Sequence, residues 1–113
     1  MRIVIVGVCA SGKSALANRL TACGYEAHVC AQEHSFAPAM WRMTEPDVLV
    51  YLDASLVTVR RRKGVDWGED QLAEQRARLA EARAHCHLYL NTEGLTEEKV
   101  FRRVRRFLDK LQR

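Results

Sequence analysis

The stretch that most constrains the fold opens the chain and reads MRIVIVGVCASGKSALANRL. An apolar run over 2–6 ends at Gly7, and beyond the loop Leu16 and Leu20 lie four residues apart, as on one face of a helix. Gly7 permits a tight turn, and Gly12 lets a ligand approach the backbone because it carries no Cβ. This pattern predicts a strand, a loop and a helix. The N–H groups of the loop, from Val8 on, would then form a concave site for an anion.

The same loop carries the side chains that a nucleoside triphosphate needs. Lys13 would place a positive charge on the β- and γ-phosphates, and the Ser14 hydroxyl is the expected Mg²⁺ ligand. A glycine-rich turn that matched by chance would lack the strand before it and the helix after it. We therefore expect ATP, or another nucleoside triphosphate, and Mg²⁺ as cofactors. The residues expected to bind the nucleotide are Gly7, Ala10, Ser11, Gly12, Lys13, Ser14 and Ala15.

Strand and helix patterns alternate along the rest of the chain. We expect strands at 2–6, 26–30, 48–52 and 86–90, and helices at 13–23, 54–62, 66–84 and from 97 onward. Asp66 is expected to cap the long third helix, and Thr96 the last helix. Alternation of this kind predicts an α/β fold, with three α-β-α layers and a mainly parallel sheet of about four strands. No repeat or linker divides residues 1–113, so we expect a single domain.

Composition excludes several classes of function. With 113 residues, 48% hydrophobic and 28% charged, the chain resembles ordinary globular proteins. No apolar stretch approaches the roughly 20 residues that span a bilayer, and no secretory signal pattern opens the chain. We therefore expect no membrane partner and a cytoplasmic location. The net charge of +4 arises from arginine clusters at 60–63 and 102–106. Aromatic residues do not alternate with these arginines, so nucleic acid is not favoured as a partner.

The loop from Gly7 to Ser14 matches the Walker A motif. Together with "VLVYLDAS" and "LVTVRRR" further on, it makes the chain resemble the small P-loop kinases, the adenylate, cytidylate, shikimate and gluconate kinase group. The resemblance covers nearly the whole chain, although only the Walker A motif is specific. It implies a P-loop nucleotide-binding fold and transfer of the γ-phosphoryl group to an acceptor. It also implies that Arg61 or Arg62, rather than Arg60, corresponds to the lid arginines of these kinases; a solvated basic helix end is the alternative.

The chain departs from that family in two places. Only residues 26–47 fill the space of the usual acceptor-binding region, so the small-molecule acceptor is unidentified. The second departure is the metal-binding acid. Asp53 ends an apolar strand but precedes a helix that begins near Asp53 or Ser55, and we expect Asp53 to act as its cap. Glu33 follows the second strand and would stand beside the loop if that strand neighbours the first. We expect Glu33, with Ser14, to hold or orient Mg²⁺; an exposed loop acid is the alternative.

These residues predict a Mg-ATP-binding P-loop protein, and we favour an enzyme. It would be a kinase for a small molecule or nucleotide, with Lys13, Glu33, Arg61 and Arg62 as its catalytic residues. The alternative is a nucleotide-binding module, or a weak NTPase without a dedicated acceptor. A homodimer is compatible with a domain of this size, although no apolar stripe in the sequence indicates one.

Overall fold

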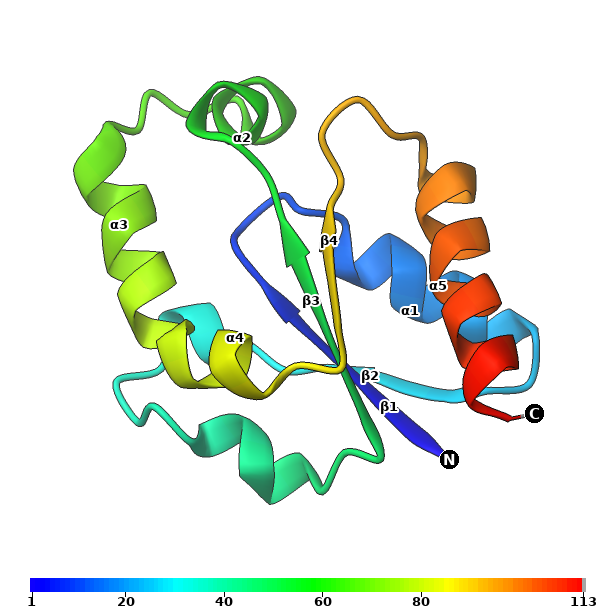
Figure 1. Cartoon of the computed structure of the whole chain (residues 1–113). Helices are drawn as coiled ribbons and strands as arrows, with labels where there is room; N and C mark the ends of the chain where they lie inside the picture. Colours follow the sequence, from blue (N-terminus) through cyan, green and yellow to red (C-terminus); the bar gives the residue numbers. More distant parts are fainter. Residues whose placement is uncertain (113) are drawn as a thin grey trace.

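The computed structural model describes residues 1–112, which form a parallel four-stranded sheet between two groups of helices (Figure 1). The strands lie in the order β2-β1-β3-β4, and each neighbouring pair is parallel. The elements are β1 (Arg2–Gly7), α1 (Lys13–Ala22), β2 (Glu26–Val29), η1 (Gln32–His34), η2 (Met40–Thr44), β3 (Val48–Asp53), α2 (Leu56–Lys63), α3 (Glu69–Arg78), α4 (Ala80–His85), β4 (Leu88–Asn91) and α5 (Glu97–Leu111). The predicted α/β class and parallel sheet are confirmed, and the arrangement is compatible with three α-β-α layers.

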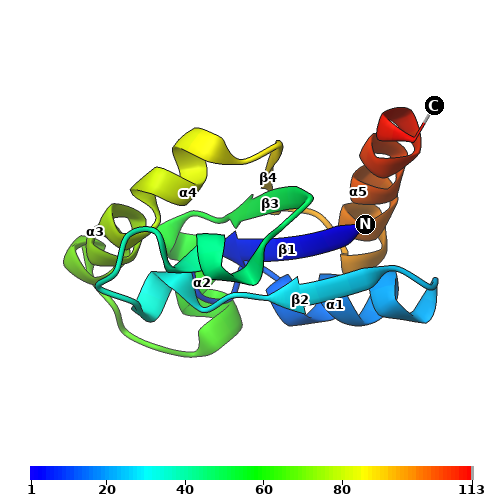
Figure 2. The ribbon, with the colours of Figure 1, turned by 90° about the horizontal axis from the view of Figure 1, so that it is seen from below.

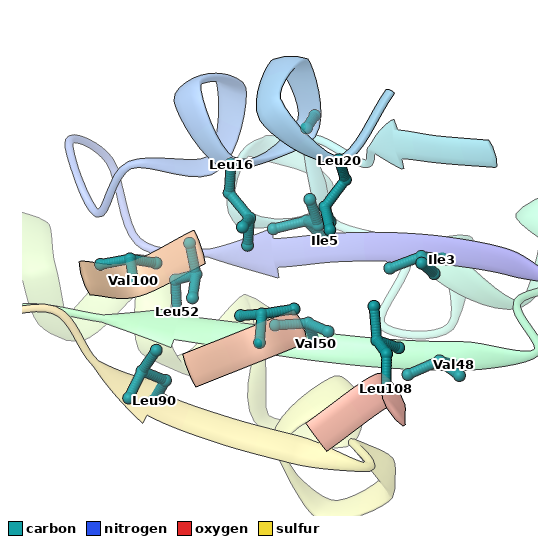
Figure 3. Packing of buried hydrophobic residues seen from close by; sticks show 12 residues of the cluster. Ile3, Ile5, Leu16, Leu20, Val48, Val50, Leu52, Leu90, Val100 and Leu108 are labelled. Carbon is teal, nitrogen blue, oxygen red and sulfur yellow. The ribbon is translucent and has the colours of Figure 1, made fainter. Parts of the chain in front are cut away.

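Helices α1 and α5 cover one face of the sheet (Figure 3). Ile3 and Ile5 of β1 point toward this layer and are completely buried. α5 supplies Val100, Val104 and Leu108, whose spacing places them on one side of the helix. Burying a side chain of this size contributes about 1.5–3 kcal/mol, so this layer fixes α1 and the loop before it against the sheet.

The opposite face packs against α3, α4 and η2 (Figure 2). Val4 and Val6 alternate with the isoleucines of β1 and meet Leu72 and Leu79 from α3 and the turn after it. Because both faces of β1 are buried, its sequence is a continuous apolar run, as is typical of a parallel strand.

Three predicted details are wrong. Ser55, not Asp53, caps α2, since its side chain accepts a hydrogen bond from the Thr58 N–H. The single long helix expected over 66–84 is two helices, α3 and α4, that meet at Leu79, and its N-cap is Gly68 rather than Asp66. Leu79 and Ala82 are both completely buried. The break is slight, because Leu79 N–H still donates to the Gln75 oxygen and Arg83 N–H to the Leu79 oxygen. Among residues 1–112, no helix is both long and apolar enough to span a bilayer.

Candidate functional site

The loop between β1 and α1 lies at the carboxyl edge of the sheet and depends on its glycines. Gly7 has a φ of +155°, and a Cβ there would stand 2.1 Å from the carbonyl oxygen of Leu52 in the neighbouring β3. Only glycine lets β1 turn so close to that strand. Ala10 and Gly12 also have positive φ angles, of 59° and 100°, which curl the backbone before α1 begins. The sequence thus folds here into a tight, concave loop.

Lys13 folds back over this loop. Its Nζ donates hydrogen bonds to the carbonyl oxygens of Gly7 (3.0 Å) and Val8 (2.8 Å). It also forms an ion pair of 2.9 Å with Oε2 of Glu33. Ser11 closes the loop from within by donating its hydroxyl hydrogen to the Val8 oxygen at 2.7 Å. The ammonium is therefore held at the mouth of the loop by two backbone carbonyl oxygens and one carboxylate.

Glu33 reaches the loop because β2 pairs with β1 and η1 follows β2 directly. Its side chain is only 5% exposed. Oε2 faces Lys13, whereas Oε1 is buried without a hydrogen-bond partner among residues 1–112. The expected position of Glu33 beside the loop is confirmed, and the alternative of an exposed loop acid is wrong. Its role toward a metal stays a prediction.

Asp53, the other candidate acid, is occupied by structural contacts. Oδ1 accepts a hydrogen bond from the Ala54 N–H and forms an ion pair with Arg76 at 3.2 Å. Oδ2 accepts from the Tyr89 hydroxyl at 2.6 Å. Partial burial and, after it, this hydrogen bond raise the pKa of Tyr89 to about 12. Asp53 therefore ties β3 to β4 and α3 rather than facing the loop.

The arginines at the end of α2 differ sharply in position. Arg62 donates to the carbonyl oxygen of Ala10 and to the Thr92 hydroxyl, both at 3.0 Å, and so touches the loop. Arg60 pairs with Asp66 instead. Arg61 is exposed and makes no side-chain hydrogen bond within the described part of the chain. Of the two arginines expected near the phosphates, the structure brings only Arg62 to the loop.

Two side chains that the sequence did not single out for such a role support the loop. Thr92 is 1% exposed, and its hydroxyl lies 2.9 Å from the Ser11 carbonyl oxygen. Gln75 is 4% exposed; its Oε1 accepts from the Cys9 N–H at 2.9 Å, and its Nε2 donates to Cys9 Sγ at 3.0 Å. The sequence could have indicated that Gln75 points inward, because it lies between Leu72 and Leu79 on the same face of the helix.

A cavity of about 390 Å³ opens beside the loop, on the side of α5. The loop and the start of α1 form one wall, and Arg62 and Thr92 form part of another. Leu95 and Val100 give the remaining wall an apolar surface, and Glu97 also lines it. Of the residues predicted to bind nucleotide, Ala10, Ser11, Gly12 and Ala15 line this cavity.

The remaining predicted residues lie apart from the cavity lining. Gly7 forms the turn below the loop, and the Lys13 ammonium sits on the Glu33 side. Ser14 is exposed in the first turn of α1. No protein-family model matches this chain, and no curated protein matches it significantly.

Proposed function

We propose that this chain is a P-loop protein that binds Mg-nucleotide and transfers the γ-phosphoryl group of ATP to a small acceptor. The observation that carries the proposal is the buried ammonium of Lys13, held between two loop carbonyls and the Glu33 carboxylate. A cation at the mouth of a glycine-bounded loop, before the N-terminus of a helix, is suited to a polyphosphate.

Nucleotide binding would redistribute these contacts. The β- and γ-phosphates would take the Lys13 ammonium from the carbonyl oxygens of Gly7 and Val8, while the loop N–H groups hold the remaining phosphate oxygens. That movement would release the Glu33 carboxylate from its ion pair. Phosphoryl transfer needs little covalent chemistry from the protein, so positioning and charge neutralisation supply most of the rate.

The donor set also suits Mg²⁺. Magnesium prefers oxygen ligands and retains several waters, so one hydroxyl and one carboxylate are sufficient beside the phosphates. Ser14 would supply the hydroxyl, and Glu33, with its unpartnered Oε1, would hold the ion or one of its waters. The ion, when bound, neutralises charge that develops on the transferred phosphoryl group.

The cavity on the α5 side fits a nucleoside base. Its volume of about 390 Å³ suits a small, flat group, and Leu95 and Val100 offer an apolar surface to it. Arg62 lies between this cavity and the loop carbonyl of Ala10, where it would neutralise phosphate charge without a large movement. Arg61 would have to swing in from the exposed end of α2, as a lid residue does.

A second candidate is a nucleotide-binding module or weak NTPase without a dedicated acceptor. One observation favours it. The segment between β2 and β3, where the related kinases hold an acceptor, packs onto the sheet instead: Trp41 of η2 is 6% exposed and Arg42 pairs with Glu81. The two candidates share the nucleotide site and differ only in where the phosphoryl group goes.

The test uses thermal unfolding and transfer of labelled phosphate. Mg-ATP at a hundred times its Kd should stabilise the chain by about 2.7 kcal/mol, roughly a 10 °C rise in Tm. Lys13→Ala should abolish that rise, whereas Lys110→Ala, an exposed lysine in α5, should leave it intact. Labelled γ-phosphate recovered on an acceptor supports the kinase, and release only as inorganic phosphate supports the alternative. If millimolar Mg-ATP does not change the Tm of the wild-type chain, both the kinase and the nucleotide-binding module are refuted.

A further inference from the structure

Three side chains that can each ligate a divalent cation converge beside the loop between β1 and α1. Cys9 lies in the loop after β1, and Glu33 and His34 lie in η1 after β2. Cys9 Sγ is 3.7 Å from His34 Nε2, which is 3.8 Å from Glu33 Oε2. One ligand atom from each residue lies within 4.8 Å of the other two. The pairing of β1 with β2 brings these two segments together.

Two of the three spacings are close to those of a tetrahedral zinc site. With Zn–S of about 2.3 Å and Zn–N or Zn–O of about 2.0–2.2 Å, neighbouring ligand atoms stand about 3.4–3.6 Å apart. The two distances that involve His34 exceed this value by only a few tenths of an ångström. Side-chain rotation would have to close the third spacing, between Cys9 and Glu33, which is at most 4.8 Å, and a water would take the fourth position. Thiolate, imidazole and carboxylate together favour zinc over magnesium.

A second observation concerns the other oxygen of the Glu33 carboxylate. Oε1 of Glu33 is buried and has no hydrogen-bond partner among residues 1–112. Burying a carboxylate oxygen without a partner is costly, and a bound cation removes that cost. Cys9 is also held in place, because Gln75 donates to its sulfur and accepts from its N–H. Such outer contacts orient a ligand for its metal. The His34 side chain is 58% exposed and leaves the cluster accessible to solvent.

We propose that Cys9, Glu33 and His34 form a binding site for Zn²⁺. The metal would compete with the Lys13 ammonium for Glu33, since Oε2 now lies 2.9 Å from Lys13 Nζ. It would also hold the one carboxylate that the Mg-nucleotide is expected to use. Zinc should therefore oppose Mg-nucleotide binding, and this consequence, unlike the zinc site itself, rests on the proposed function.

The zinc site is tested without nucleotide, by titrating the reduced chain with Co²⁺ and then displacing it with Zn²⁺. We expect one ion per chain and a sulfur-to-cobalt charge-transfer band in the near ultraviolet. Cys9→Ser should abolish the band, and His34→Gln should weaken zinc binding at least about tenfold. His34 is exposed, so its variant should stay folded, and circular dichroism checks the Cys9 variant. The exposed residues Cys23 and His28 provide matched controls, Cys23→Ser and His28→Gln, which should bind as the wild type does.

Two results would overturn the zinc site: a titration without a sulfur band, or a Cys23→Ser or His28→Gln chain that loses the ion as completely as Cys9→Ser. The antagonism is measured separately, as zinc affinity with and without Mg-ATP. If the chain binds zinc and Mg-ATP does not change its Tm, the proposed function is refuted and the zinc site is supported. If each binds but neither changes the affinity of the other, only the antagonism is wrong.

Discussion

The ion pair between Lys13 and Glu33 gives the sharpest test of how this site is held without nucleotide. Its atoms are 2.9 Å apart, and the side chains are only 10% and 5% exposed. At an effective dielectric constant of about 20, the Coulomb attraction at that distance is about 6 kcal/mol. The desolvation of the two ions offsets much of this attraction. The informative quantity is therefore the loss of unfolding free energy when one partner is removed.

The two removals should cost different amounts. Without the Glu33 charge, Lys13 still donates to the carbonyl oxygens of Gly7 and Val8. Glu33→Gln should therefore lower the free energy of unfolding by about 1–2 kcal/mol. Without Lys13, the buried carboxylate keeps only the His34 ring, 3.8 Å away, so Lys13→Met should cost about 3–5 kcal/mol. The double variant no longer buries a lone charge and should be more stable than Lys13→Met alone. We expect a coupling free energy of about 2 kcal/mol or more.

The assay is urea unfolding of the four chains near neutral pH, with a chelator present and no nucleotide. Arg102 and Glu98 form a shorter but exposed pair in α5, at 2.6 Å, and serve as the control cycle. Their coupling should be only about 0.3–0.5 kcal/mol, since solvent screens them. If Lys13→Met costs under about 1 kcal/mol, or the two losses simply add, Lys13 is not what stabilises the buried carboxylate.

Two further perturbations address the loop and the neighbouring sheet edge. Gly7→Ala should lower the free energy of unfolding in urea by about 3 kcal/mol or more, because its Cβ would stand 2.1 Å from the Leu52 oxygen. The control Gly64→Ala, at a φ of +70° with open space around it, should lower it by about 1 kcal/mol. Equal losses for the two variants would contradict the close contact at Gly7. Partial burial and the bond to Asp53 raise the pKa of Tyr89 to about 12, so its stabilisation is complete below pH about 10 and lost as the pH rises to about 12. Tyr89→Phe should flatten the decline of unfolding free energy over that pH range, and an unchanged decline would assign it to other groups.

The sequence alone was sufficient where local pattern and tertiary environment agree. The run before Gly7 is apolar on both faces because the strand is buried on both faces, so its position in the sheet could be predicted. Thr96 was correctly predicted as the cap of α5, because its hydroxyl accepts from Lys99 N–H in the usual local way. The break at Leu79 was not predictable, because no glycine or proline marks it.

The candidate site was predictable only in part, for the same reason. Lys13 and its loop follow from local sequence, and Glu33 could be placed beside them once β2 was assumed to neighbour β1. The support from Gln75 and Thr92 depends on contacts across 66 and 81 residues of chain, to Cys9 and Ser11 respectively. The local pattern indicates that Gln75 points inward, but it does not indicate either partner. Asp53 was misassigned as a cap because a strand-ending acid before a helix commonly caps it, whereas here Ser55 does.

The strand order makes the two sides of the loop between β1 and α1 chemically different. β1 lies between β2 and β3, so its loop has different neighbours on its two sides. Toward β2 stand the Glu33 carboxylate and the Cys9–His34 pair, which are groups that attract cations. Toward β4 and α5 lie Arg62 and the cavity with its apolar wall. A phosphate chain on the loop would thus have its base on the α5 side and its terminal phosphate toward Glu33. For the proposed kinase, this direction predicts that the acceptor approaches from the η1 side, where His34 is exposed.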